Sequence, residues 1–522
     1  METLYLKLAV ASPISIGCDE VYEPTGFVVD EEARELISFD THEFLQMLDK
    51  DSLQRFSAIC AKGTISSLLE LMRFMRQNRQ HAHGERCELT PAFLDHYRQV
   101  LGMKNNPKEI QQGLNNFKIG RTAFNVHTNL PVIPGSSIKG AIRTAVLNLR
   151  NNGKTFPSFK GRQANRKLQE HLLKYQTQQL VSDPFRLVKV SDFVPAGDFR
   201  CRVLYAVNLK KRPSERESQG PPQILEVIEP GAEFIGTICI QKPGRKSQVQ
   251  TPVTREEILQ AMKQFYGAEN RRENQELSRI HCQPLQLASQ GLPLRVGRHS
   301  GAECVTVAGH RAIKVSPPRK KPLKFQDHAT TLWLAAESKK PGSTIGLRPF
   351  GWTFLSPLKS GEMETMKKSA CLLEQKRLEM IRNRTEKQRI ESERRARQAV
   401  EEKKERLRRE DEARRKAEEE IARREAELAT MPDDKAWLVR REQDNNWKED
   451  NSALLADAES FFENFSAPGI DALDMLGKWL SKKWPGIMQN PDATKGKKKK
   501  AKYKERPSTL AKKILKLQED EQ

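Results

Sequence analysis

The sequence predicts an α+β fold for residues 1–356 and a helical extension after them. Apolar and polar residues alternate over short stretches such as 3–10, which is typical of half-buried strands. Between these stretches, segments such as 255–265 place apolar residues three or four positions apart, as amphipathic helices do. Strands and helices that are mixed without a regular βα repeat indicate the α+β class. After Pro357 the alternation ends, and Glu, Lys and Arg dominate.

The elements of the α+β part are predicted from the same two periodicities. Helical spacing occurs at 66–75 and again at 255–265. Strand-like alternation occurs, in chain order, at 3–10, 202–207, 234–240 and 305–307. With about 100–200 residues per domain as the usual size, a chain of 522 residues is expected to hold two or more domains.

The chain is strongly basic, with 90 Lys and Arg against 68 Asp and Glu and a formal net charge of +22. A field of this sign attracts polyanions such as RNA and makes their binding depend on salt. Anionic membranes would be attracted too, but no stretch is long and apolar enough to span a bilayer, and the N-terminus alternates as a strand does. The sequence therefore predicts a cytoplasmic protein without a membrane partner.

The cysteines and histidines do not indicate a metal site. Eight cysteines show neither paired CxxC spacing nor a disulfide-dense pattern, so reduced thiols are expected. His81, His83 and Cys87 have metal-binding side chains, but a fourth ligand at a recognisable spacing does not accompany them. We expect no cofactor.

The segment 133–144 predicts a turn followed by the start of a helix. Pro134 and Gly135 end the preceding extended run, and a serine is expected to accept a hydrogen bond from one of the first free amides. Ser136 and Ser137 are the candidates for this cap. The apolar face that the helix is expected to bury consists of Ile138, Ile142, Ala145 and Leu149.

Cationic side chains lie on a neighbouring face of this predicted helix. Lys139 and Arg143 are four residues apart, and Arg150 follows further along. Unpaired amides, the positive end of the helix dipole and fixed positive charges together favour a bound anion such as a phosphate. The alternative is an ordinary capped helix whose Lys and Arg side chains face solvent.

A glycine-rich segment further along the chain is the second candidate contact for RNA. Gly297 and Gly301 allow the backbone to approach a phosphate closely. Arg295 and Arg298 supply charge and a bidentate guanidinium, and His299 lies beside them. An ordinary turn is the alternative interpretation.

The segment 133–144 resembles the signature helix of the RAMP superfamily, the repeat-associated RNA-binding subunits of CRISPR effector complexes. Other blocks are similar to the same superfamily, and several of them to one branch, the cap subunit of the type III-A (Csm) complex. These blocks are 4–17, 22–30, 183–192, 229–236, 294–301 and 348–352. They occur in the expected order, and the resemblance covers about residues 1–356.

The resemblance implies two ferredoxin-like (RRM-like) units, which periodicity alone does not give. The first is expected at 1–190 and the second, with the glycine-rich loop, at 191–356. In RAMP proteins this loop lies against RNA. The implied RNA-binding residues are Ser136, Ser137, Lys139, Arg143, Arg295, Gly297, Arg298, His299 and Gly301. Trp352 is a further candidate for stacking on a base, although burial in the core is the simpler expectation.

The resemblance also implies a non-catalytic subunit that binds the guide RNA (crRNA), caps the 3′ end of its filament and supports its maturation. The implied partners are crRNA and the other subunits of the complex, especially the backbone RAMP subunit. Backbone subunits cut target RNA with an aspartate, and Asp19 and Asp30 lie in the corresponding region, but cap subunits are not known for this activity. The alternative function is a metal-independent endoribonuclease that processes precursor guide RNA with His299 as general acid or base.

Residues 357–432 are predicted to form a long charged helix. Gly and Pro are missing from 366–429, and acidic and basic residues recur four positions apart. A coiled coil is not favoured, because residues such as Lys403 and Arg424 occupy positions that must be apolar in its core. We expect a solitary helix that acts as a spacer, about 95 Å long at 1.5 Å per residue.

Residues 433–490 are predicted to form a small helical hairpin and 491–522 a disordered basic tail. The apolar residues of the hairpin are Leu454, Leu455, Ala458, Phe461, Phe462, Phe465, Leu473, Leu476, Trp479 and Leu480. Because this segment is too short to form a robust hydrophobic core of its own, we expect it to dock on another surface. The candidates are the α+β part of this chain, a neighbouring subunit and a trans-acting nuclease. The tail carries 11 Lys and Arg against five acids, which suits either attraction of RNA or a solvated charge run.

Overall fold

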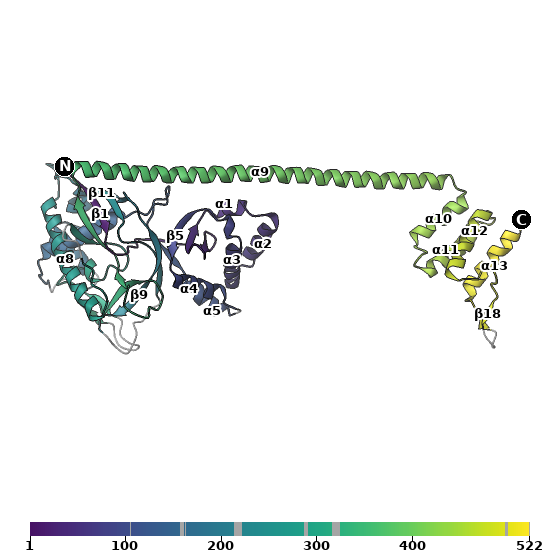
Figure 1. Ribbon diagram of the computed structural model, residues 1–522, viewed down its shortest axis with the longest axis horizontal. Coiled ribbons are helices and arrows are strands. Elements are labelled where there is room, and N and C mark those ends of the chain that lie inside the picture. Colours follow the sequence, from purple (N-terminus) through teal and green to yellow (C-terminus); the bar gives the residue numbers. More distant parts are fainter. Residues whose placement is uncertain are drawn as a thin grey trace. The chain divides into compact units, whose positions relative to one another are not determined.

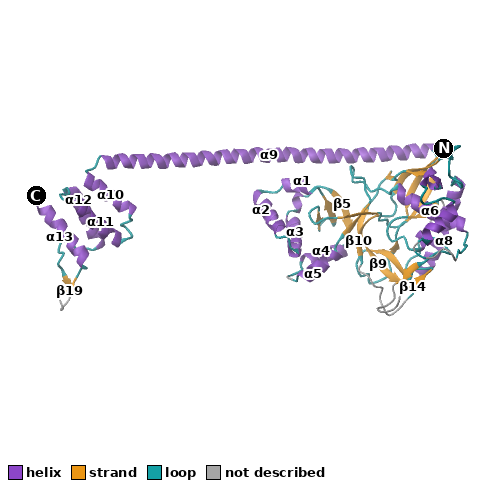
Figure 2. Cartoon of the chain, turned by 180° about the vertical axis from the view of Figure 1, so that it is seen from behind, coloured by secondary structure: helices purple, strands orange, loops and turns teal. Residues whose placement is uncertain are grey.

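The computed structural model describes residues 1–104, 106–156, 161, 163–212, 222–286, 291–315, 324–495 and 500–520 (Figure 1). Over these residues the chain forms two compact units, 1–393 and 394–522. The first unit is a mixture of helices and sheets, and the second is mainly helical (Figure 2). The α+β class predicted for residues 1–356 is therefore confirmed. In the described part of the chain, the helices lack the combination of length and apolarity that crossing a bilayer requires.

One sheet of the first unit has the strand order β12–β17–β1–β11–β7, with antiparallel neighbours, and β8 also pairs with β11. Its strands are β1 (Glu2–Val10), β7 (Val188–Val190), β8 (Val194–Pro195), β11 (Glu233–Ile240), β12 (Leu292–Arg295) and β17 (Trp352–Pro357). The alternation predicted for 3–10 appears in β1 as alternate buried side chains, among them Leu6 and Leu8.

Two helices that lie side by side cover this sheet, α6 (Gly135–Asn151) and α8 (Arg255–Arg279) (Figure 2). The predicted apolar face of α6 is buried at Ile138, Ile142 and Ala145, and Leu149 is partly buried against the same core. α8 adds Ile258, Met262 and Phe265 to that core, which explains its helical periodicity in the sequence. A shorter helix, α7 (Ala164–Leu173), packs beside α6.

A second sheet has the order β2–β6–β10–β9–β5–β4–β3, with β15 paired to β9 and to β16. Its strands are β2 (Gly17–Val21), β3 (Phe27–Asp30), β4 (Glu35–Ser38), β5 (Glu85–Leu89), β6 (Ile119–Thr122), β9 (Cys201–Lys210), β10 (Gln223–Ile228), β15 (Thr331–Ala336) and β16 (Arg348–Pro349). The expected strand at 305–307 is wrong, because Val305 ends a short 3-10 turn, Glu303–Val305. β13 (Ile313–Val315) and β14 (Lys324–Gln326) form a separate short pair.

Helices from the first part of the chain pack on the second sheet. They are α1 (Thr41–Gln46), α2 (Lys50–Ala61), α3 (Ile65–Gln77), α4 (Pro91–Leu101) and α5 (Pro107–Asn116). α3, which covers the predicted helix at 66–75, contributes Leu69 and Met72 to the core under one face of this sheet. α4 contributes Phe93 and Tyr97 to the same core.

Residue 190, the expected boundary between two sequential units, does not separate the two sheets of the structure. β1 pairs with β11 from Glu2 to Ala9 and with β17 on its other side. A central strand whose side chains are buried needs partners on both sides, and the chain supplies them from beyond residue 230. Each sheet thus combines strands from both sides of the predicted boundary.

α9 runs from Ser360 to Ala429 as one helix of 70 residues. The helix is not solitary over its whole length, because its first part belongs to the first unit. There, Arg377 donates to the Thr128 carbonyl at 2.9 Å and pairs with Glu85, and the Lys367 amine lies 4.0 Å from the centre of the Tyr5 ring. Side chains from 396 to 427 are all exposed.

The second unit corrects the expectations for the C-terminal region. The predicted hairpin is present as α11 (Asn451–Asn464) and α12 (Ile470–Lys483), but α10 (Asp433–Asp444) and α13 (Glu505–Asp520) complete a core of its own. The expected disordered tail is wrong for α13, because Leu510 and Ile514 lie one helical turn apart and are buried against α11 and α12. β18 (Thr494–Lys495) pairs with β19 (Lys500–Ala501), and the parts of the predicted tail at 496–499 and 521–522 lie outside the described residues.

Candidate nucleic-acid interface

The start of α6 differs from the predicted serine cap. The N-cap residue is Pro134, and the first amide of the helix, that of Gly135, donates to Oδ1 of Asp192 at 2.8 Å. A Cβ on Gly135 would lie 2.4 Å from the Val190 carbonyl oxygen, so the chain after β7 approaches the helix start too closely for any other residue. Ser136 and Ser137 therefore do not cap the helix.

The serines instead line a groove of about 440 Å³ between α6 and the glycine-rich loop. From α6 the groove is lined by Ser136, Ser137, Gly140 and Thr144. The loop after β12 contributes Gly297, Arg298 and Ser300, and the start of β2 contributes Gly17 and Asp19. The structure thus brings together the two segments that the sequence marks as RNA contacts, from positions about 160 residues apart.

Close approach of the backbone requires glycine in the loop. Gly297 has a φ of 91°, and a Cβ there would lie 2.6 Å from the Ser15 carbonyl oxygen. The amide of Arg298 donates to that same carbonyl at 2.8 Å. The loop is therefore fixed against the segment that leads into β2, and only a glycine fits at position 297.

Arg298 is a partly exposed cation of the groove, whose lining also includes the buried Arg295. Its side chain is 36% exposed and lies over Gly17, where a Cβ would come within 2.5 Å of the guanidinium Nε. The Asp19 carboxylate is 3.9 Å from Arg298, and the Asp19 side chain is fully exposed. Exposed ion pairs contribute about 0–1 kcal/mol, so this guanidinium can exchange its carboxylate for a phosphate at little cost.

Arg295, which was predicted to contact RNA, is buried. Its guanidinium donates to Glu273 at 2.8 Å and to the Phe350 carbonyl at 2.8 Å, and it lies over the Trp352 ring. The Trp352 indole N–H donates to the other oxygen of Glu273 at 2.7 Å. The pairing of Arg295 with a carboxylate of α8 inside the core does not support its predicted contact with RNA, whereas the expected burial of Trp352 is confirmed.

Arg143 is likewise engaged within the protein. It donates to both carboxylate oxygens of Asp183, at 2.9 and 3.1 Å, and lies over the rings of Tyr175 and Phe185. Its role as a phosphate contact is therefore not supported. The ion pair instead connects α6 to the chain segment before β7, since Asp183 caps the 3-10 turn Pro184–Leu187 that leads into that strand.

Lys139 and Arg150 lie outside the groove lining. Burial lowers the pKa of the Lys139 amine, nearby Lys189 and Arg143 lower it further, and Asp183 partly offsets these effects. Lys139 thus belongs to the side of α6 that carries the Arg143 pair. Arg150 forms a bidentate pair with Glu257 of α8, at 2.6 and 2.9 Å, and joins the two helices.

His299 points away from Arg298, toward the second sheet. Its ring stacks on Trp333 at a centroid distance of 4.7 Å, and Nε2 lies 3.2 Å from the Gln223 side-chain oxygen. Burial lowers the pKa of His299 to about 4, and the neighbouring arginines Arg298 and Arg295 add to this effect. The imidazole is therefore neutral at physiological pH.

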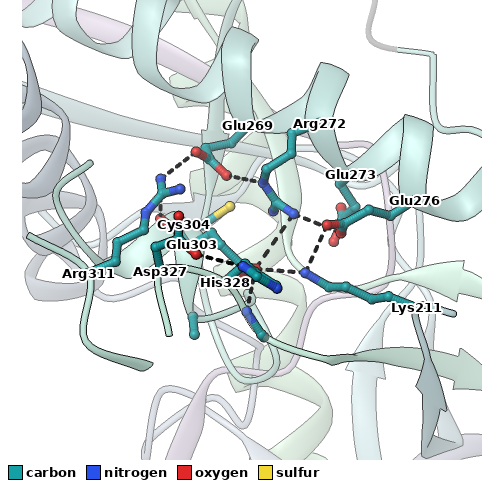
Figure 3. Close-up of polar contacts among 12 residues, drawn as sticks. Lys211, Glu269, Arg272, Glu273, Glu276, Glu303, Cys304, Arg311, Asp327 and His328 are labelled. Atoms are coloured by element: carbon teal, nitrogen blue, oxygen red, sulfur yellow. Dashed lines mark hydrogen bonds and ion pairs between the residues drawn. The ribbon is translucent and has the colours of Figure 1, made fainter. Parts of the chain in front are cut away.

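A buried network of charges holds the segment after the glycine-rich loop (Figure 3). Lys211, which directly follows β9, pairs with Glu303 at 2.6 Å and with Glu276 of α8 at 2.9 Å. Glu269 pairs with Arg272 at 2.7 Å and with Arg311 at 2.6 Å. Burial alone would raise the pKa of Glu303, but Lys211 and Arg272 hold it at about 2.

Sequence reasoning missed this network, although one signal was present. Glu269, Glu273 and Glu276 recur three or four residues apart, which places them on one face of α8. That face points inward, and all three are buried. The basic partners come from distant positions such as Lys211 and Arg311, so the sequence alone did not identify them.

A family model described as the RAMP superfamily matches residues 7–282. A chain of a Csm–crRNA–target RNA ternary complex, solved by cryo-EM in a type III-A CRISPR-Cas system, is similar at 18% identity and a TM-score of 0.44, over 68% of this chain and 100% of its own. Csm5 of T. onnurineus, known from a crystal structure, is similar at 18% identity and a TM-score of 0.36, over 57% of this chain and 92% of its own. A comparison with curated proteins finds no match.

The matched range begins in β1 and ends just after α8, so it contains α6, most of the first sheet and the start of the groove. It spans more than half of the 522 residues. This chain therefore belongs to the RAMP superfamily.

Proposed function

We propose that this protein is a non-catalytic subunit that binds guide RNA and caps the 3′ end of the guide filament in a type III-A CRISPR interference complex. The observation that carries the proposal is the groove in which the start of α6, the glycine-rich loop and Arg298 meet. The assignment to the cap position rests on the order of the sequence blocks that resemble cap subunits. Its partners are crRNA and the other subunits of the complex, above all the backbone RAMP subunit.

The chemistry of the groove supports a ribose-phosphate ligand. Ser136 and Ser137 present hydroxyls at the N-terminal end of α6, where the helix dipole is positive. Gly140 and Gly297 keep the walls free of side chains, which lets a backbone approach closely. Arg298 supplies a guanidinium that can bind a phosphate with two hydrogen bonds. Such contacts position RNA without reading its sequence, as suits a guide of any sequence.

We further propose that the first sheet, with α6 and α8, is a ferredoxin-like unit whose connections are expanded. Helix α6 joins β1 to β7, and α8 joins β11 to β12 and β17. The strand order β17–β1–β11–β7 is the order that a split βαβ arrangement produces. The strands of the second sheet lie in the chain segments that connect the elements of this unit. One boundary in the sequence therefore cannot separate the two sheets.

The proposal assigns no bond cleavage to this chain. Asp30 accepts the amides of Glu32 and Ala33 and thus forms a turn, and Asp19 lies beside Arg298. His299 is held by Trp333 and Gln223, and its pKa of about 4 makes it a weak base. The alternative, an endoribonuclease, is tested by incubating the full chain with precursor RNA, with and without EDTA. Specific cleavage that His299→Ala abolishes would replace the proposal.

Footprinting tests the cap position directly. The full chain is assembled with the other subunits on a guide RNA labelled at one end, and backbone cleavage by hydroxyl radicals is mapped along the guide. We expect this chain to protect nucleotides in the 3′ region, and omission of the chain to expose them while protection elsewhere persists. Protection at the 5′ end, or an unchanged footprint without the chain, would contradict the cap role.

Support of guide maturation is a separate part of the proposal. A cap that covers the 3′ region sets how far a trimming nuclease can proceed, so the length of the mature guide depends on it. We expect complexes assembled without this chain to carry guides of altered 3′ length, and Arg298→Ala to produce a partial shift in the same direction. Sequencing the 3′ ends of purified guides measures both.

A further inference from the structure

A second hollow, of about 370 Å³, lies on the other side of the glycine-rich loop, between the loop and β15. We propose that this pocket receives one unstacked RNA base, with Trp333 as the stacking platform. The inference rests on the proposed function, because it assumes that an RNA strand lies along the adjoining groove. Gly297 and Ser300 line both hollows, so the loop is the wall that they share.

The aromatic wall of the pocket comes from β15 and the loop. Leu332 and Leu334 are buried on the core side of β15, and Trp333 lies between them on the opposite face, half-buried. The His299 ring is tilted by 31° against the Trp333 ring, and the ring centroids of His299 and Phe350 are 5.3 Å apart. A planar base that enters the pocket can stack on this aromatic cluster, because every base has a face that stacks on an aromatic ring.

The electrostatics of the pocket suit a neutral base and not a phosphate. Two carboxylates, Glu273 and Glu303, form part of its lining, and each is paired with a cation from the core. Arg295 also lines the pocket and is the partner of Glu273, so the charged side chains of the described lining are already paired within the protein and leave a phosphate without an available cation, whereas a base needs none. The neutral imidazole of His299, which lines the pocket, adds a donor or an acceptor that can meet a base edge.

The loop backbone directs neighbouring side chains into different hollows. Gly297, His299 and Gly301 all have positive φ, at 91°, 59° and 77°. For His299 this left-handed conformation is unfavourable, and such strain concentrates at functional positions. As a result Arg298 lines the groove and His299 lines the pocket. Adjacent side chains thus face the sites that a phosphate and its own base would occupy.

The charge network described above makes the pocket rigid. Glu303 accepts from Lys211 and from the Ala329 amide, at 2.6 and 2.8 Å, and both Glu303 and Ala329 line the pocket. Arg295 and Glu273 fix the opposite wall. A preformed pocket loses little entropy when a base enters, which raises the affinity that stacking can supply.

The test uses the full chain and a set of single-stranded RNAs of one sequence, each with 2-aminopurine at a different position. In the wild-type protein we expect strong quenching of the fluorophore at one position, as stacking on an indole produces. Trp333→Ala should remove that quenching and weaken RNA binding about five- to 150-fold. Trp333→Phe retains an aromatic face and should keep most of both signals. Phe325→Ala is the matched control, an exposed aromatic outside the pocket, and should change neither.

A second measurement changes the RNA instead of the protein in its first step. The same RNA is prepared with an abasic site at each position in turn, and its affinity for the wild-type chain is measured. One position with a marked loss supports the pocket, and this loss should vanish in Trp333→Ala, because the pair acts as a double-mutant cycle. A flat profile overturns the inference while leaving the proposed function intact. Failure of every RNA to bind the wild-type chain overturns the proposed function itself.

Discussion

The glycine-rich loop has an inner side, which faces the core and carries Arg295, and an outer side, which faces the groove and carries Arg298. The two arginines differ in burial and in how closely a carboxylate pairs with them. Arg295 is buried and bonded to Glu273 at 2.8 Å, whereas Arg298, three residues later, is partly exposed and lies 3.9 Å from an exposed carboxylate. The first fixes the loop on the core, and the second is open to a ligand. A basic residue in a sequence is therefore a candidate for RNA binding, and its carboxylate partners decide whether it is available.

The same contrast holds between α8 and α9, which are both rich in Glu and Arg. In α8 the acids at 269, 273 and 276 are buried, and each has a cationic partner from a distant part of the sequence, Arg311, Arg295 and Lys211 respectively. In α9 the pairs between 396 and 427 are local and exposed. Removal of one partner of a buried pair lowers the free energy of unfolding by several kcal/mol, whereas removal of one partner of an exposed pair lowers it by about 1 kcal/mol or less. These environments predict a ranked series of effects.

Glu273→Ala should produce the largest effect. It leaves the Arg295 guanidinium and the Trp352 indole N–H buried without their shared acceptor. We expect the free energy of unfolding to fall by about 3–5 kcal/mol. Urea denaturation of the first unit measures the loss. Little change would mean that Arg295 does not depend on Glu273 inside the core. The two arginines of the loop would then be equally available to a ligand.

Arg143→Ala should be next, because the Asp183 carboxylate then loses its partner in a half-buried position. Hydrogen bonds to charged groups contribute about 1.5–3 kcal/mol, and the free energy of unfolding should fall by that amount. Arg143→Lys restores only the charge, so it should recover part of the loss. If Arg143→Ala instead had normal stability and weakened RNA binding, Arg143 would contact RNA like Arg298 and would not serve to hold the fold together.

Lowering the pH should weaken the charge network through Glu303. Its pKa is about 2 in the folded protein, below the ordinary 4.5, so the unfolded chain binds more protons between these values. Stability from this carboxylate is present above pH 4.5 and is lost as the pH falls toward 2, by about 3 kcal/mol at most, because each pKa unit is worth about 1.4 kcal/mol. Urea midpoints at several pH values measure it. Glu303→Gln should be less stable at neutral pH and should lack this part of the pH dependence.

Asp411→Ala should have the smallest effect. Its partner Arg414 is 2.9 Å away on the exposed part of α9, and both side chains are about two-thirds exposed. We expect a change of about 0.5 kcal/mol or less, seen as a slight loss of helical circular dichroism. A loss comparable to that of Glu273→Ala would show that α9 has a buried partner in solution.

The elements that local sequence specifies were predicted well. The alternation of 3–10, the apolar face of α6 and the periodicity of α8 all depend on neighbouring residues, and the structure has a strand and two helices there. The glycine-rich loop and the start of α6 were each predicted to contact RNA, with support from the family resemblance. The groove confirms that these segments meet.

The roles of individual side chains were predicted less well because distant residues decide them. The Asp192 carboxylate accepts a hydrogen bond from the first amide of α6, so the expected serine cap is not needed. Asp183 engages Arg143 from forty residues away in the chain. α13 is ordered because its apolar residues meet α11 and α12, although its composition alone resembles a solvated tail. None of these partners can be identified from spacing.

The most direct test of the central claim compares Arg298 with Arg143 in RNA binding. Fluorescence anisotropy gives the affinity of the full chain for a labelled single-stranded guide RNA at several salt concentrations, and hence the slope of log K against log salt. We predict that Arg298→Ala lowers the magnitude of this slope by about 0.7, the loss of one phosphate contact, and that Arg143→Ala leaves it unchanged. An unchanged slope for Arg298→Ala, together with a lower slope for Arg143→Ala, would contradict the account.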